Sequence, residues 1–436
     1  MEMARTAVPY PSIASSLSAF VPSPMPSPLR FSILGECRSS AARVGRVETP
    51  HGSFETPAFM PIGTRGAIRG LTPEQVRLTG TQIILANAYH LLLRPGAERI
   101  AGLGGIHEFM RWSGPILTDS GGYQAFSMAD ISDVDEEGIT FASIVDGSRC
   151  HLSPERSIEV QNQLGADIIM ALDDCPPSAD PEAPRPGEPA RRGRRGAASP
   201  AGRADVDHPR RLRESHERTV RWLHRCVAAH ARPQEQALFG IVQGGTDLDL
   251  RRAAVEAVCN VDLPGYAIGG VAVGEGPRLI HSVVEFTCPL MPPDKPRYLM
   301  GVGYERDLVA AVRAGADMFD CVLPTRNGRN ASAFTRSGRI RLRNSQFGDD
   351  GRVIEPGCGC HTCSGGFSRA YLRHLFMANE MLGPILVSLH NIHHFQRLML
   401  DIRRAIREDS WASLFGCWPV LERPLQEPLT GRGRGA

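Results

Sequence analysis

Short apolar runs that end in polar or small residues recur along the chain and limit its possible folds more than any other feature. They occupy residues 82–87, 115–124, 167–175, 237–245, 266–270, 297–303 and 317–320. Each run contains a short continuous apolar stretch, as expected for a strand that is buried on both faces. Strands of this kind belong to parallel sheets that are covered by helices on both sides or closed into a barrel.

Segments with helical spacing lie between these runs, for example at residues 155–164, 248–258 and 306–314. The resulting β-α alternation predicts a parallel sheet. The number of repeats within 436 residues favours an α/β fold of the closed (β/α)8 TIM-barrel type over an open doubly wound sheet. None of the glycine clusters has the G-x-G-x-x-G spacing of a dinucleotide site.

The run that ends at Asp320 is followed by Arg326 and Arg329 in what we expect to be a polar loop. Parallel barrels carry their chemistry at the carboxyl ends of their strands, so Asp320 is a potential nucleophile. An isolated aspartate at a strand end is more often a cap or an ion-pair partner. The two arginines favour the functional interpretation, because they would hold a polyanionic substrate next to the acid.

Composition predicts one large catalytic domain with appendages, since 42% of the residues are hydrophobic and 22% are charged. The formal net charge of +2 is small, so any nucleic-acid contact must come from a local basic patch. No run approaches the roughly 20 apolar residues of a membrane helix. Eleven scattered cysteines without a signal peptide indicate a reducing compartment, and we expect a cytoplasmic protein that does not bind membranes.

Two segments fall outside the barrel pattern. Residues 1–31, rich in Pro, Ser and Ala, are expected to form a disordered extension; their composition loosely resembles that of a transit peptide. Residues 176–208 are rich in Pro, Gly and Arg and are expected to form a disordered insertion, after which a helix resumes at 214–229. The predicted barrel domain spans 32–411, and residues 412–436 would form a C-terminal tail.

Cys358, Cys360 and Cys363 lie within one tight turn, and together with one histidine they would form a tetrahedral Cys3His zinc site. His390 follows a predicted helix at 367–381, but other histidines are also close enough in sequence to serve: His361, His393 and His394. Such a site has no open position for substrate, so its Zn²⁺ would be structural. Residues 339–343 alternate basic and apolar side chains, as would a strand with one basic face.

Five sequence blocks carry a resemblance to a known family. They are residues 119–124 (Asp-Ser-Gly-Gly-Tyr-Gln), 240–245, 298–303, 319–326 and the cysteine cluster. Over roughly residues 32–411 the chain resembles bacterial-type tRNA-guanine transglycosylases, the queuine tRNA-ribosyltransferase family, which exchange guanine for a queuosine precursor at the anticodon wobble position. The resemblance implies a (β/α)8 barrel with a zinc-binding subdomain at about 335–400 and His390 as the fourth ligand.

The resemblance also implies residue roles. Asp320 would attack the ribose, and Asp119 would act as general acid and base, although by itself Asp119 could simply cap the following turn. Asp173 and Gln243 would bind the guanine edge, while Tyr123 and Met300 would sandwich the ring or, alternatively, form a buried core pair. The other residues implied for the base pocket are Asn87, Gln124, Cys175, Gly269, Gly270 and Val271. Arg326 and Arg329 would contact the tRNA anticodon loop.

Cys175 and the segment 271–275 resemble the bacterial branch, which implies 7-aminomethyl-7-deazaguanine as the incoming base in exchange for guanine. In this interpretation Glu275 would help to place the aminomethyl group through the backbone carbonyl of Val271. A homodimer is implied as well. The alternatives are a queuine-using transglycosylase, a non-catalytic tRNA-binding partner and a glycoside or nucleoside hydrolase on the same barrel. The presence of both Asp119 and Asp320 argues against a non-catalytic partner.

Overall fold

Eight short parallel strands form the central sheet of the computed structural model, which describes residues 28–128, 132–178 and 207–422. In spatial order they are β4 (Ala58–Pro61), β14 (Met318–Cys321), β13 (Arg297–Leu299), β12 (Gly265–Ile268), β11 (Ala237–Val242), β10 (Ile168–Met170), β6 (Ile116–Thr118) and β5 (Ile84–Ala86). A parallel bridge between Ile62 and Leu85 links the two edges of the sheet. The predicted α/β barrel is therefore confirmed, with β4 as a strand that the seven predicted runs did not include.

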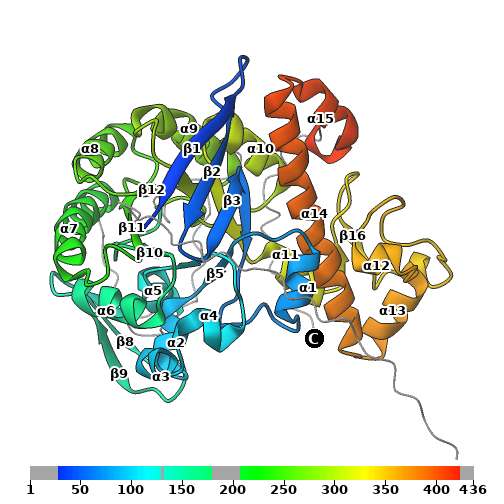
Figure 1. Cartoon of the computed structure of the whole chain (residues 1–436), viewed down its shortest axis with the longest axis horizontal. Coiled ribbons are helices and arrows are strands. Elements are labelled where there is room, and N and C mark those ends of the chain that lie inside the picture. Colours follow the sequence, from blue (N-terminus) through cyan, green and yellow to red (C-terminus); the bar gives the residue numbers. More distant parts are fainter. Residues whose placement is uncertain (1–27, 129–131, 179–206, 423–436) are drawn as a thin grey trace, which may run out of the picture.

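Helices follow the strands and cover the outside of the sheet (Figure 1). They are α1 (Pro73–Leu78), α2 (Ala88–Leu93), α3 (Ala97–Gly102), α4 (Gly105–Met110), α5 (Gly122–Met128), α6 (Pro154–Leu164), α7 (His208–Ala229), α8 (Leu248–Cys259), α9 (Pro277–Thr287), α10 (Glu305–Arg313) and α14 (Leu382–Arg407). Local sequence sets their limits: α6 starts at the N-cap Ser153 with Pro154 in its first turn and ends at Gly165 in the left-handed region. The helix predicted at 214–229 begins earlier, because Asp207 caps α7.

Apolar side chains fill the inside of the barrel, among them Met170, Phe239 and Met318. Val47 and Phe54 belong to the same cluster and come from an antiparallel sheet made of β1 (Arg30–Glu36), β2 (Arg43–Thr49) and β3 (Gly52–Thr56). This sheet closes the N-terminal end of the barrel. The opposite end, where the strands end, is left for functional groups.

Two further units extend the barrel. A small antiparallel sheet of β7 (Ser132–Val134), β8 (Ile139–Ala142) and β9 (Arg149–Leu152) lies between α5 and α6 in the sequence. The second unit follows α11 (Leu323–Arg329) and contains β15 (Ser332–Ala333), β16 (Ile340–Arg341), η2 (Ser345–Phe347), α12 (His361–Ser364) and α13 (Arg369–Met377). Figure 1 shows this second unit on the far side of the long helix α14 from the barrel. After α14 come α15 (Trp411–Cys417) and η3 (Pro419–Glu422), and η1 (Cys288–Leu290) extends α9.

Two local predictions are wrong. The segment after Asp320 is the helix α11 and not a loop, because a proline in the first helical turn costs no hydrogen bond. The strand predicted at 339–343 is shortened to the two residues of β16. The predicted extension 1–31 and insertion 176–208 lie mostly outside the described residues, and the domain bounds stay predictions. Within residues 28–128, 132–178 and 207–422, no helix is long and apolar enough to cross a membrane.

Candidate active site and metal centre

Three buried carboxylates lie at the carboxyl ends of barrel strands. Asp119 directly follows β6, Asp173 follows β10 and Asp320 lies within β14, and their exposed fractions are 6%, 6% and 8%. The strands β6 and β10 are adjacent, and β14 lies on the other side of the barrel. The fold thus collects at one end acids that are more than 50 residues apart in sequence.

Asp320 is held through one oxygen. Its Oδ1 accepts hydrogen bonds from the Tyr298 hydroxyl at 2.6 Å and from the Gly301 backbone N–H at 2.8 Å. Burial raises the pKa of Asp320, and these two bonds oppose the rise. Burial and the charge of Asp320 hold the pKa of Tyr298 well above its usual value, so this hydroxyl keeps its proton and donates.

Asp119 accepts three hydrogen bonds. The Ala88 backbone N–H donates to Oδ1 at 2.8 Å, while the Gln124 amide at 2.9 Å and the Asn87 amide both donate to Oδ2. Burial raises the pKa of Asp119 to about 6 against these bonds, and the negative charge of Asp320 adds to the rise. A carboxyl group with this pKa can both give and take a proton near neutral pH.

Asp173 faces the amide of Gln243, whose Nε2 donates to Oδ2 at 2.6 Å. Burial raises the pKa of Asp173 to about 7, and the charge of Asp174 contributes to the rise. Burial also raises the pKa of the Cys175 thiol to about 12, with the charge of Asp173 as the next cause. Cys175 is therefore a neutral group in this pocket and not a thiolate.

Glycines allow the chain to pass close to Gln243. Gly270 has a φ of +62°, and a Cβ at this position would collide with the Gln243 side chain. A Cβ at Gly269 would lie 2.6 Å from Ile241 and 3.7 Å from the Met300 sulfur. Any larger residue at either position would displace the amide that faces Asp173. The neighbouring Val271 is buried.

Tyr123 lies at the start of α5 and is 45% exposed, so it is not part of a buried core pair in this structure. Burial raises the pKa of its hydroxyl, and the nearby Cys175 and Glu275 add to the rise. Met300 is partly buried and packs against the inner cluster of the barrel. Both side chains therefore lie at the same end of the barrel as Asp173.

Arg251 and Glu275 organise the strand ends. Arg251 is fully buried and donates to the backbone carbonyls of Gly245, Val242 and Gly269 at 2.7–2.9 Å. The sequence analysis did not predict this role of Arg251. Its position on the apolar face of α8, three and four residues before Ala254 and Val255, could have indicated a buried arginine.

Glu275 accepts hydrogen bonds from the backbone N–H groups of Ala272 and Val273 and from the Ser178 hydroxyl. Because a trans peptide directs its C=O opposite to its N–H, the Val271 carbonyl points away from Glu275. Glu275 thereby fixes the orientation of the peptide next to Gly270.

Two arginines of a basic group lie on α11, the helix that begins three residues after Asp320 in the sequence. Arg326 is exposed and Arg329 half-buried on α11, and burial together with the charges of Arg69 and Arg326 lowers the pKa of Arg329. The three guanidinium groups are therefore close enough to repel one another. Arg339, Arg341 and Arg343 are exposed around β16. Such a concentration of cations suits a polyanion.

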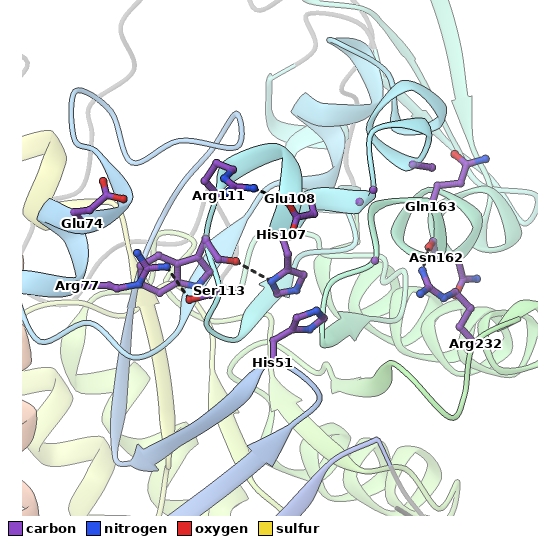
Figure 2. A pocket seen from close by; sticks show the side chains of 15 residues that line it. His51, Glu74, Arg77, His107, Glu108, Arg111, Ser113, Asn162, Gln163 and Arg232 are labelled. Carbon is purple, nitrogen blue, oxygen red and sulfur yellow. Dashed lines mark hydrogen bonds and ion pairs between the residues drawn. The ribbon is translucent and has the colours of Figure 1, made fainter. Parts of the chain in front are cut away.

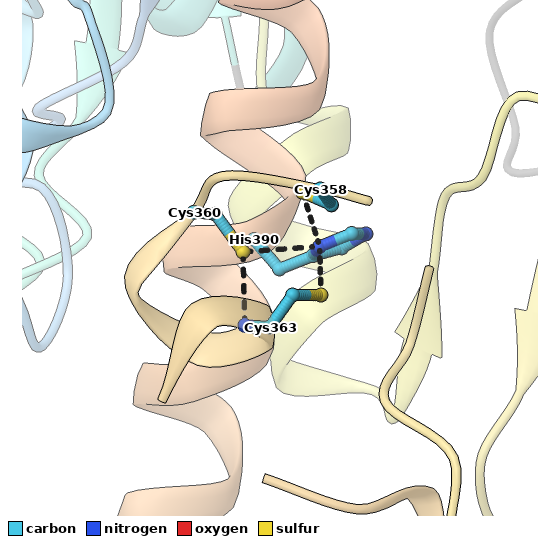
Figure 3. A group of neighbouring side chains, drawn as sticks. All are labelled: Cys358, Cys360, Cys363 and His390. Carbon is cyan, nitrogen blue, oxygen red and sulfur yellow. Dashed lines mark hydrogen bonds between the residues drawn. The ribbon is translucent and has the colours of Figure 1, made fainter. Parts of the chain in front are cut away.

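The cysteine cluster assembles around His390 in α14 (Figure 3). The His390 Nδ1 lies 3.8 Å from the Cys358 sulfur, 3.4 Å from that of Cys360 and 3.5 Å from that of Cys363. Tetrahedral zinc with bonds of about 2.3 Å to sulfur and about 2.0 Å to nitrogen separates these atoms by about 3.5 Å. The spacing therefore fits a zinc ion.

The second ring nitrogen of His390 fixes the orientation of the ring, since Nε2 donates to the Phe334 carbonyl at 2.7 Å. Nδ1 is then free to bind a metal ion. His394 instead pairs with Glu305 at 2.9 Å. Among the described residues, the potential metal-binding group at this place contains His390 and none of the three competing histidines.

Comparisons with known proteins agree with this architecture. A family model described as queuine tRNA-ribosyltransferase matches residues 37–188 and 203–417. A queuine tRNA-ribosyltransferase of Cyanothece sp. is 49% identical over 397 residues, which cover 91% of this chain and 97% of that protein. Its counterpart in Thermus thermophilus is 51% identical over 381 residues, covering 87% and 91% of the two chains. The chain belongs to the queuine tRNA-ribosyltransferase family.

Membership in the queuine tRNA-ribosyltransferase family confirms the predicted family and the predicted enzyme class, a pentosyltransferase. The match leaves out residues 189–202, which lie inside the segment predicted to be an insertion. The roles of the individual site residues stay predictions, and the geometry above is the basis on which we argue them.

Proposed function

We propose that this enzyme exchanges guanine at the wobble position of tRNAs with GUN anticodons for 7-aminomethyl-7-deazaguanine. The observation that carries the proposal is the meeting of Asp119, Asp173 and Asp320 at one end of the barrel, each held by neutral hydrogen-bond donors. One acid can attack ribose, the second can move a proton and the third can bind a base.

In the first step, Oδ2 of Asp320 attacks the ribose anomeric carbon. Both hydrogen bonds described above end on Oδ1, which supports Oδ2 as the attacking atom. The C1′–Oδ2 bond forms as the C1′–N9 bond breaks, and the electron pair of that bond leaves with guanine. Asp119, with a pKa of about 6, supplies the proton that the leaving base takes up.

In the second step, the incoming base attacks C1′ and releases Asp320, while Asp119 takes back the proton from the base. Two inversions give net retention at the ribose. Asp173 would accept from the ring and exocyclic N–H groups of either base, and Gln243 would bond its carbonyl. Tyr123, at the entrance, would stack on the base against Met300, and the Val271 carbonyl would receive the aminomethyl group.

We propose that Arg326 and Arg329 bind the phosphates on either side of the target nucleotide, because both lie on α11, which begins three residues after Asp320. The homodimer and the cytoplasmic location that the sequence predicts fit a tRNA-modifying enzyme and stay predictions. Sedimentation of the purified chain would settle the first of these.

Incorporation of labelled guanine into a tRNA with a GUN anticodon tests the proposal. Asp320→Asn should lose at least about 10⁴-fold in exchange rate, while Asp262→Asn, at an exposed residue far from the site, should keep the full rate. Denaturing electrophoresis should show a protein–tRNA adduct in the wild type and none in Asp320→Asn. Exchange by Asp320→Asn at the wild-type rate would refute the mechanism.

The same assay separates the alternatives. Displacement of label by queuine but not by 7-aminomethyl-7-deazaguanine would identify a queuine-using enzyme. Release of guanine without incorporation of another base would identify a hydrolase. Binding of tRNA without exchange would identify a non-catalytic partner.

We propose that the ion of the Cys3His site is Zn²⁺, which would supply no chemistry to the reaction and would tie the 358–363 turn to α14. Elemental analysis of the purified enzyme should find about one zinc per chain. Cys363→Ser should lose this zinc and melt at a lower temperature, whereas Cys417→Ser, at an exposed cysteine, should change neither. Full zinc content in Cys363→Ser would refute the assignment.

A further inference from the structure

A second group of potential metal ligands lies at the opposite, N-terminal end of the barrel. It consists of His51 in the β2–β3 turn, His107 in α4 and Asp167 immediately before β10, and the ligand atoms of the three residues all lie within 4.8 Å of one another. Figure 2 shows the two imidazole rings side by side on the wall of a cavity of about 680 Å³. None of the three residues takes part in the proposed reaction.

His107 presents an unused lone pair to this group. Its Nδ1 lies 3.1 Å from the Trp112 carbonyl, which can only accept, so Nδ1 carries the hydrogen. Nε2 is then an acceptor, and it faces the Asp167 Oδ2 at 3.2 Å. His107 is only 8% exposed, and its Nε2 has no hydrogen-bond donor within the described structure. Two buried acceptors that face each other require a cation between them.

Asp167 is fixed in place but keeps room for such a cation. Its Oδ1 accepts from the backbone N–H of His51 at 3.1 Å, and its Oδ2 accepts from that of Ile116 at 2.9 Å. Each carboxylate oxygen can accept a further bond. The Asp167 side chain is fully buried.

We propose that His51, His107 and Asp167 bind a divalent transition-metal ion, such as Co²⁺ or Ni²⁺, in addition to the ion of the Cys3His site. Two imidazole nitrogens and one carboxylate are the donors that these ions prefer. Bonds of about 2.1 Å from Nε2 and Oδ2 would meet at an angle of about 100°, which suits tetrahedral and octahedral ions. Water from the cavity would complete the coordination.

The stacking of the two rings assigns different roles to them. Their centroids are 3.5 Å apart and their planes differ by 13°, and a nitrogen lone pair lies in the plane of its ring. One ion cannot lie in both planes, so His107 and Asp167 are the fixed ligands. His51, whose side chain is 42% exposed, completes the site by turning about its side-chain bonds.

The Cys3His centre offers an internal precedent for the arrangement of His107. There too a buried imidazole donates one N–H to a backbone carbonyl, that of Phe334, and directs its other nitrogen at anionic ligands. This outer hydrogen bond fixes the tautomer and the ring orientation of a ligand histidine. The rival for the second site is a proton on His107 Nε2, which would make a simple imidazolium–carboxylate pair.

Calorimetric titration of the zinc-loaded enzyme with Ni²⁺ and with Co²⁺ tests the proposal. We expect one further equivalent per chain, and the bound Co²⁺ should lack the intense charge-transfer bands of thiolate ligation. His51→Gln, at a half-exposed residue, should weaken binding at least tenfold, and His107→Gln should abolish it. His151→Gln, at an exposed histidine bonded to Thr140, is the matched control and should bind as the wild type does.

Thermal melts of the variants would show that each is folded. Absence of a further equivalent in the wild type would overturn the proposal and leave the proton as the cation. Binding that persists unchanged in both His51→Gln and His107→Gln, or Co²⁺ with thiolate bands, would also overturn it, since the ion would then be bound elsewhere. None of these readouts depends on the exchange reaction, so the proposed function can fail or hold independently.

Discussion

Two barrel strands carry an aspartate at each end. The aspartates at the N-terminal end of the barrel have different partners from those at the C-terminal end. Asp167 precedes β10 and Asp173 follows it, while Asp317 and Asp320 lie at the two ends of β14. At the N-terminal end the partners are basic: Asp317 forms two hydrogen bonds with the Arg43 guanidinium at 2.7–2.9 Å, and Asp167 faces two histidines. At the C-terminal end the partners are amides, a hydroxyl and backbone N–H groups.

This difference separates acids that face basic side chains from acids that have only neutral partners. The pKa of Asp167 is held well below its usual range, because the two histidines that face it outweigh burial, so its charge links β10 to the β2–β3 turn and α4. Burial without a counter-charge instead raises the pKa of Asp173 to about 7 and that of Asp119 to about 6. Neutral partners thus leave a proton available for chemistry, and the native state is less stable at neutral pH as a result.

The largest expected effect contrasts the two ends of β14. Asp317→Asn should destabilise the protein by about 3–5 kcal/mol, because the buried Arg43 would lose its counter-charge. Asp320→Asn should be at least as stable as the wild type near pH 8, because it removes a buried charge that no cation balances. Urea unfolding of the three proteins measures both effects.

The exchange rate should respond to the two substitutions in the opposite way from stability. Folded Asp317→Asn should retain its rate per molecule, whereas Asp320→Asn should be inactive. Equal loss of stability in the two variants would show that the ends of β14 do not differ in the way we describe.

A second prediction concerns the pH dependence of stability. The pKa of Asp173 is raised on folding from about 3.8 to about 7, so its stabilising contribution is present below pH 4 and is lost as the pH rises to 7. Relative to Asp173→Asn, the wild type should lose up to about 4 kcal/mol over this interval. The matched variant Asp167→Asn should show the opposite trend, because its pKa is lowered and its contribution is lost in acid. Urea unfolding at several pH values gives both differences.

The sequence did not predict most of the difference between the two ends of the barrel. Asp119, Asp173 and Asp320 were predictable as site candidates because each ends an apolar run, and strand ends converge in a barrel. The partners were not, since Tyr298 meets Asp320 only through the pairing of β13 with β14. A pKa depends on those partners, so the sequence identified the acids without separating those that face basic side chains from those with neutral partners.

Elements whose signal is local were predicted best. The cysteine turn lies within six residues, and the helices predicted at 155–164, 248–258 and 306–314 agree with α6, α8 and α10 to within one residue at each end. The short strand β4 begins after Pro57 and ends at Pro61, and prolines at these positions argue against a strand in the sequence. His51 and His107 are 56 residues apart, and only the closure of the barrel base brings their rings together.

Base binding should also reveal the proton on Asp173. Guanine offers N–H donors to this carboxyl, so binding requires the ionised form and should release a proton below pH 7. We expect the affinity for guanine to rise about tenfold per pH unit from pH 5 to 7 and to level off above. Calorimetry in two buffers of different ionisation enthalpy measures the proton release, which Asp173→Asn should lack. If the affinity of the wild type for guanine did not change with pH, Asp173 would be ionised at all these pH values.

The smallest expected effect concerns Asp320, the proposed nucleophile. Tyr298→Phe removes the 2.6 Å hydrogen bond that opposes the raised pKa of Asp320, while the bond from Gly301 remains. One bond to a charged group stabilises it by about 1.5 kcal/mol, so exchange near pH 7 should slow by about tenfold. Because the deficit comes from the protonated carboxyl, the rate should recover toward the wild-type value as the pH rises. Tyr266→Phe is the matched control, since this buried hydroxyl bonds the Val261 carbonyl and not the site. A deficit in Tyr298→Phe that does not change with pH would mean that Tyr298 positions Asp320 without setting its charge.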